Sequence, residues 1–224
     1  MVKIFLLSLW KQFVSLIPVL VLTCIPPVFI LAAVAIFMRV NHQKMSVVLN
    51  DPASITGTPF YYGFISNLGV LLWTAAAAIC LFSSFLLPAS NRKERTFLCV
   101  SGIFTVFLLL DDLLMLHEAV FPNYLHISGA VYAFFYFLLL GTYLVFFTKT
   151  ILKTDFILLA MALFLFVISI GFDLTHDRGL MKFTGEMFLE DGSKFIGITV
   201  WLAYFARTSC QCVLRSSATK EGPL

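Results

Sequence analysis

Acidic residues and histidines gather in three short segments of an otherwise apolar sequence. The segments are Asp111-Asp112-Leu113-Leu114-Met115-Leu116-His117-Glu118, Asp173-Leu174-Thr175-His176-Asp177 and Glu190-Asp191-Gly192-Ser193-Lys194. Carboxylates beside imidazoles can hold a divalent metal, take up and release protons, or pair with a cation. Ionisable groups inside apolar segments are costly, so they indicate a functional site. The three segments therefore predict a polar site.

The composition predicts the solvent around this site. Hydrophobic residues make up 60% of the 224 residues and charged residues only 12%, whereas soluble domains carry about 25% charged residues. A chain of this length has too few polar side chains to cover its apolar surface in water. We therefore expect an all-α, polytopic transmembrane helical bundle surrounded by membrane lipids. No long basic run is present, and no nucleic-acid partner is expected.

Six apolar segments are long enough to cross a bilayer, which takes about 20 residues. A single transmembrane domain over residues 1–224 is expected, in which Pro26-Pro27 bends the first helix. The stretch Ala75–Ala78 should let a neighbouring helix approach closely. The predicted helices cover residues 13–38, 62–87, 96–120, 127–147, 156–176 and 187–206, and residues 207–224 form a polar cytoplasmic tail, expected to be disordered.

The distribution of Lys and Arg between the predicted loops sets the orientation. With the N-terminus inside, ten of the fifteen basic residues fall on the cytoplasmic side and five on the other. The positive-inside rule then predicts that both termini are cytoplasmic. All three acidic segments lie at the extracytoplasmic end of the bundle in this topology. The five cysteines show no framework spacing and are expected to be free thiols.

Helical geometry predicts which side chains share a face. At about 100° per residue, Asp111 and Glu118 are nearly superposed on one continuous helix, while Asp112 and His117 point to opposite flanks. Asp173, His176 and Asp177 share one arc of their helix, and Glu190 and Lys194 lie on one stripe with Asp191 at its edge. The three stripes are expected to face one interior space.

The favoured interpretation is a metal-dependent, membrane-embedded hydrolase or oxidoreductase acting on a lipid-like substrate. Its zinc or iron would be held in the bundle, as facing helices hold metals elsewhere. The candidate metal ligands are Asp111, His117, Glu118, Asp173, His176 and Asp177. Glu190 and Asp191 are the candidate catalytic residues, one acting as general base. No zincin, nucleophile-elbow, phosphate-loop or dinucleotide motif accompanies them.

Two alternatives stay open on the sequence. In a structural or assembly subunit of a membrane complex, Lys194 and Arg178 would pair with the acids. In a proton-coupled or cation-coupled transporter, the acids would pass charge along the bundle. A transporter typically has a broken helix at its site, and the sequence predicts none beyond Pro26-Pro27. The identity of the metal, the substrate, the membrane and the oligomeric state are open.

Overall fold

The structure is a computed structural model, and it describes residues 2–177 and 186–218. Its regular elements are all helices within those ranges, which confirms the all-α prediction. The chain divides into two compact units, Met1–Tyr62 and Gly63–Leu224. The candidate site lies in the second unit.

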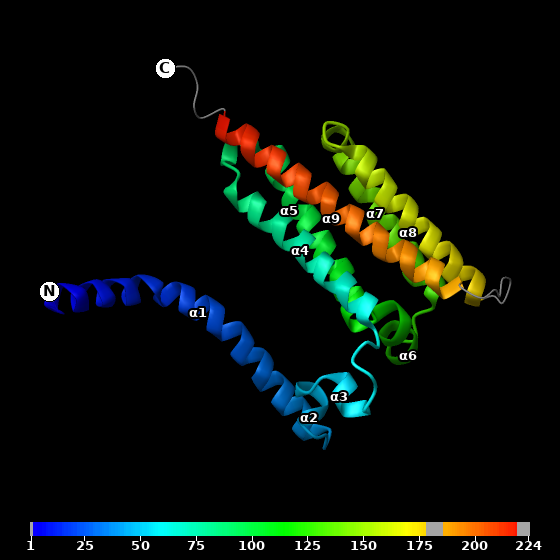
Figure 1. The fold of residues 1–224 in the computed structure, drawn as a ribbon, viewed down its shortest axis with the longest axis horizontal. Coiled ribbons are helices and arrows are strands. Elements are labelled where there is room, and N and C mark those ends of the chain that lie inside the picture. Colours follow the sequence, from blue (N-terminus) through cyan, green and yellow to red (C-terminus); the bar gives the residue numbers. More distant parts are fainter. Residues whose placement is uncertain (1, 178–185, 219–224) are drawn as a thin grey trace. The chain divides into compact units, whose positions relative to one another are not determined.

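The first unit contains one long helix and two short ones. Helix α1 (Val2–Val40) starts earlier than predicted and contains Pro18, Pro26 and Pro27. Figure 1 shows α1 as a curved helix, as expected where prolines remove backbone hydrogen bonds. Two short helices follow, α2 (Ser46–Leu49) and α3 (Pro52–Thr56).

The second unit is built from five long helices, labelled in Figure 1. They are α4 (Phe64–Leu86), α5 (Arg92–Leu114), α7 (Gly129–Ile151), α8 (Phe156–Asp177) and α9 (Glu186–Ala218). Helix α9 packs against both α4 and α8, and α4 also packs against α5. Three short elements connect them: η1 (Ala89–Asn91), η2 (Leu116–Val120) and α6 (Phe121–Tyr124).

Aromatic and small residues alternate in the core of this unit. Trp73, Phe104 and Trp201 meet at its centre, with ring centroids 5.7 Å and 6.1 Å from Trp201. Ala76 and Ala77 of α4 are buried, which confirms the close approach predicted for the alanine stretch. A Cβ added at Gly102 would lie 2.7 Å from Leu81, so α5 packs on α4 at glycine distance.

The helices are those of a membrane protein. Four of the described segments are long and apolar enough to span a bilayer: Leu16–Val40, Phe64–Leu86, Ala89–Leu114 and Val131–Ile151. In α8 the apolar segment Phe156–Phe172 extends to the last residue of that helix whose side chain is described. Helix α9 carries Glu190, Asp191 and Lys194 near its start. The prediction of an all-helical membrane protein is therefore confirmed, and four candidate spans lie among the described residues, whereas the predicted count of six spans stays a prediction.

The C-terminal boundary of α9 differs from the prediction. The segment after Ala206 was expected to leave the helix, but α9 continues to Ala218. Polar contacts with the loop before α8 explain the extension. The Arg207 guanidinium and the Gln211 amide both bond to Asp155 Oδ2, at 2.8 and 3.0 Å. The polar side chains of this C-terminal part of α9 thus have a hydrogen-bond partner in the loop before α8.

Candidate functional site

A break in the helix backbone shapes the first acidic segment. Helix α5 ends at Leu114, and Met115 adopts a left-handed conformation with φ 49°. A π-helical turn, η2, follows directly. The prediction of one continuous helix over residues 96–120 is wrong at this point. Left-handed backbone costs about 1–2 kcal/mol for a residue with a Cβ, and such residues and π-turns are frequent at functional sites.

The break folds His117 back onto the end of α5. Its Nδ1 lies 2.8 Å from Asp111 Oδ2, and its backbone N–H donates to Asp111 Oδ1 at 3.2 Å. Its Nε2 lies 3.3 Å from Glu118 Oε1. Exposure decreases from one side chain to the next: Glu118 is 60% exposed, His117 28% and Asp111 9%. We call Asp111, His117 and Glu118 the His117 group.

Two carboxylates control the protonation of this imidazole. Burial acts to lower the pKa of His117, but its hydrogen bonds to Asp111 and Glu118 outweigh burial and raise the pKa to about 9. The hydrogen bond to His117 in turn lowers the pKa of Glu118, against the opposing effect of burial. At neutral pH the group is therefore an imidazolium between two carboxylates.

Aromatic residues of α7 cover the inner side of the His117 group. The Tyr132 ring stacks on the His117 imidazole with centroids 5.8 Å apart. Tyr136 follows one turn later, 4.4 Å from Tyr132 between centroids. Both hydroxyl oxygens are buried near Asp111. Neither has a hydrogen-bond partner among the described residues. Buried phenol groups normally have a partner, so these two hydroxyls extend the polar site inward.

Asp112, the neighbour of Asp111, belongs to a separate set of contacts. Lys194 Nζ of α9 lies 2.7 Å from Asp112 Oδ1. The Trp73 indole N–H of α4 donates to Asp112 Oδ2 at 2.8 Å. We call Trp73, Asp112 and Lys194 the Lys194 group. It joins three helices through one carboxylate, and it is the charge pairing that the structural interpretation of the sequence predicts for Lys194.

The predicted site residues are brought together in part. Asp111, His117 and Glu118 lie in contact, although through the helix break and not along one helix face. Glu190 is half-buried and Asp191 exposed near the start of α9. The side chains of Asp173, His176 and Asp177 lie outside the described residues, so their place in the site stays a prediction.

The described side chains do not fit a metal centre. They contain no group of three or more His, Cys, Asp or Glu side chains placed to hold one ion. His117 engages both carboxyl oxygens of Asp111, and Lys194 and Trp73 engage those of Asp112. All five cysteines are free, as predicted.

Sequence reasoning did not single out Trp73, Tyr132 or Tyr136. One signal was available, because an indole N–H or a phenol hydroxyl in an apolar helix needs a polar partner when it is buried. In a chain with seven tyrosines and three tryptophans, that signal alone does not select these three. Their selection requires knowing which helices are neighbours.

Comparison with known proteins gives a family without a described activity. No curated protein and no solved structure matches the chain. Residues 20–208 match a family described as a domain of unknown function (DUF8692). The matched segment includes the His117 group, the Lys194 group and most of every candidate span. The chain therefore belongs to the family of the domain of unknown function DUF8692.

Proposed function

We propose that this protein is a membrane transporter that carries protons across the bilayer, and that its proton site is the His117 group. The observation that carries the proposal is the position of His117, whose two ring nitrogens each contact a carboxylate, one exposed and one buried. An imidazole accepts a proton on one nitrogen and releases it from the other. Glu118 is then the entry from water, and Asp111 is the inner acceptor, next to the Tyr132 and Tyr136 hydroxyls.

The helix break supports a transporter over a static structural site. Transporters commonly bind ions where a membrane helix is interrupted, and here α5 is interrupted three residues after Asp112. Left-handed Met115 and the π-turn make this the strained part of the site. A change of backbone conformation there would separate His117 from Asp111 and release the proton. The state with both contacts formed corresponds to the proton-loaded site.

The charges of the two groups favour protons over a metal. Lys194 and protonated His117 already compensate two of the three carboxylates in contact, which leaves one net negative charge on Asp111, Asp112, Glu118, His117 and Lys194. A divalent ion would have to displace these partners. The metal-dependent enzyme predicted from the sequence, with zinc or iron and a lipid-like substrate, therefore lacks a supporting observation among the described residues.

The proposal is tested by proton uptake into proteoliposomes under an imposed, inside-negative potential, read with an entrapped pH dye. Wild-type protein should acidify the lumen faster than protein-free liposomes. His117→Gln should lower the protein-dependent rate at least about a hundredfold, at the lower end of the range typical for loss of a proton-transferring residue. Glu118→Gln should lower it less, because water can replace an exposed entry group.

His126→Asn is the matched control. His126 lies in a loop with φ 54°, a conformation that Asn tolerates, and it belongs to neither group. The control should keep the wild-type rate. Folded wild-type protein that transports no protons above the liposome background would contradict the proposal, as would equal losses in the His117 and His126 variants.

The proposed topology has six spans, because α8 and α9 cross the membrane in addition to the four candidate spans. Both termini are then cytoplasmic. On a cysteine-free background, single cysteines at Asn50 and Lys182 should react with an impermeant reagent from outside, and one at Lys93 should not. Reaction at Lys93 alone would place the His117 group on the cytoplasmic side.

A further inference from the structure

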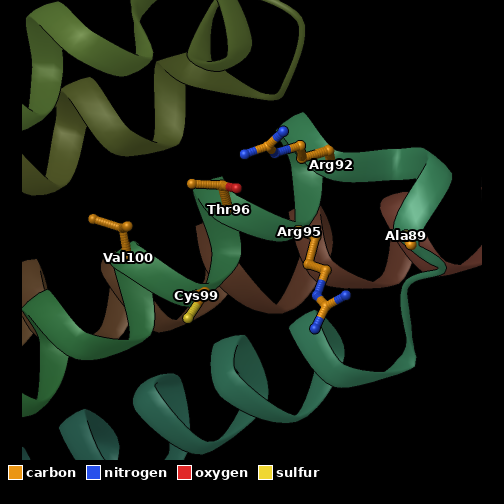
Figure 2. Close-up of a pocket in the computed structure, with 6 residues that line it drawn as sticks. All are labelled: Ala89, Arg92, Arg95, Thr96, Cys99 and Val100. Carbon is orange, nitrogen blue, oxygen red and sulfur yellow. The ribbon is translucent and has the colours of Figure 1, made fainter.

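A second polar feature lies at the opposite end of α5 from the His117 group. It is a pocket of about 380 Å³ lined by Ala89, Arg92, Arg95, Thr96, Cys99 and Val100. Figure 2 shows Arg92 and Arg95 as the charged residues of this pocket, with Thr96, Cys99 and Val100 further along the helix. We propose that the pocket binds the phosphate headgroup of an anionic phospholipid.

The two guanidinium groups have no side-chain partner among the residues that the structure describes. In the part of the chain that the structure describes, neither Arg92 nor Arg95 takes part in an ion pair or a side-chain hydrogen bond. The acidic residue of the same turn, Glu94, does not line the pocket. Burial and then the nearby Glu94 carboxylate raise the pKa of Cys212 on α9, so Glu94 faces α9. No described side chain therefore pairs with the positive charges of the pocket.

The position of the pocket selects a lipid as the source of the anion. Arg92 and Asp111 lie nineteen residues apart on one continuous helix, which is about 28 Å at 1.5 Å per residue. That distance matches the hydrocarbon thickness of a bilayer, about 30 Å. With the His117 group at one boundary of the hydrocarbon, the pocket lies at the other, at the depth of lipid phosphates.

The residue spacing suits a molecule with a charged head and an apolar chain. Arg92, Thr96 and Val100 follow one another at intervals of four residues, as do Arg95 and Cys99, so each set lies along one face of α5. Arg pairs with phosphate through parallel N–H donors. The Thr96 hydroxyl comes next, and then Cys99 and the exposed Val100 continue along the helix into the apolar span. Inorganic phosphate would use only the first part of this surface.

The test is native mass spectrometry of the full-length protein released from detergent with added phosphatidylglycerol. A direct hydrogen bond from a guanidinium group to the lipid phosphate contributes about 1 kcal/mol net, which corresponds to about fivefold in affinity. Arg92→Gln and Arg95→Gln should each weaken retention of phosphatidylglycerol about fivefold. Lys93→Gln removes the same charge from the same turn, outside the pocket, and should change retention less than twofold.

Two further measurements distinguish a lipid headgroup from free inorganic phosphate as the bound anion. Phosphatidylcholine should be retained much less than phosphatidylglycerol, and millimolar inorganic phosphate should not displace the bound lipid. Equal weakening by all three substitutions would show unspecific attraction and overturn the proposal. Displacement by phosphate, or equal retention of phosphatidylcholine, would overturn it as well. Because both arginines are exposed and have no side-chain partner among the described residues, the variants should keep the wild-type melting temperature, which would show that they are folded.

Discussion

Asp111 and Asp112 are neighbours in the sequence, yet their carboxylates serve two different arrangements. Asp111 contacts His117, six residues away on the same stretch of chain, and the contact exists because the helix breaks between them. Asp112 contacts Lys194 and Trp73, which come from α9 and α4. One carboxylate thus has a local partner that loses its charge as the pH rises through about 9, and the other has a distant partner that stays charged through that range.

The difference separates proton exchange from helix assembly. The Lys194 group ties three helices with a permanent charge pair, so its loss should destabilise the fold at any pH near neutral. The His117 group has a titratable member and an exposed end, so its contribution should depend on pH. The Lys194 group can then keep the helices in place while the His117 group gains and loses a proton.

The largest effect is expected from Lys194→Met. This change leaves the mostly buried Asp112 carboxylate without its cation. Removing one partner of a buried pair costs about 3–5 kcal/mol, and because Lys194 is about one-third exposed, we expect roughly 2–4 kcal/mol. Thermal unfolding in detergent should show a clearly lower Tm. Lys194→Arg, which keeps the charge, should recover most of the stability.

The double variant Asp112→Asn/Lys194→Met sharpens this prediction. It removes the uncompensated charge and should be more stable than Lys194→Met alone. A double variant that is less stable than the single one would mean that Lys194 acts through some partner other than Asp112.

A smaller and pH-dependent effect is expected from His117→Gln. The His117 pKa is raised from 6.5 to about 9 by its carboxylate partners, so its stabilising contribution is complete below about pH 6.5 and is lost as the pH rises through 9. At pH 7 the loss should be roughly 2 kcal/mol. The Tm of wild type should fall between pH 7 and pH 10, and the variant should lose this slope. Parallel curves for the two proteins would contradict the pairing.

The smallest effect on stability is expected from Glu118→Gln. The Glu118 side chain is 60% exposed, and exposed ion pairs contribute about 0–1 kcal/mol. The Tm at pH 7 should change by little, while proton uptake falls measurably. A loss of stability as large as that of Lys194→Met would assign Glu118 a structural role and remove it from the proton path.

Metal addition is expected to leave the Tm of the wild-type protein unchanged. This measurement distinguishes the proposed His117 and Lys194 groups from a metal centre. A ligand that binds only the folded state raises the Tm by mass action. Wild type should therefore melt at one temperature with chelator and with added Zn, Mn or Fe. A clear rise with one metal, lost in His117→Ala, would restore the metal-dependent enzyme predicted from the sequence.

The apolar helices were predicted well from the sequence, and the side-chain partners of the acidic residues were predicted poorly. Apolar runs locate α4, α7 and α8 within a few residues because the length of a span is set by the bilayer. The break at Met115 was not predictable, because a methionine carries no signal for left-handed backbone. Helix-wheel geometry therefore failed for His117 and Glu118, which lie beyond the break. Pairing of Lys194 with an acidic residue was predicted only within an alternative interpretation, and Asp112 was not named as its partner, since that choice depends on which helices are neighbours.

The protonation of His117 tests the central claim most directly. The chain has four histidines, so the ¹⁵N-labelled imidazoles can be assigned by comparing wild type with His117→Gln. In wild type, His117 should stay doubly protonated from pH 6 to 8 and titrate near pH 9. Asp111→Asn should move this titration toward the ordinary value of about 6.5. A His117 that titrates at or below 6.5 in wild type, unaffected by Asp111→Asn, would contradict the account.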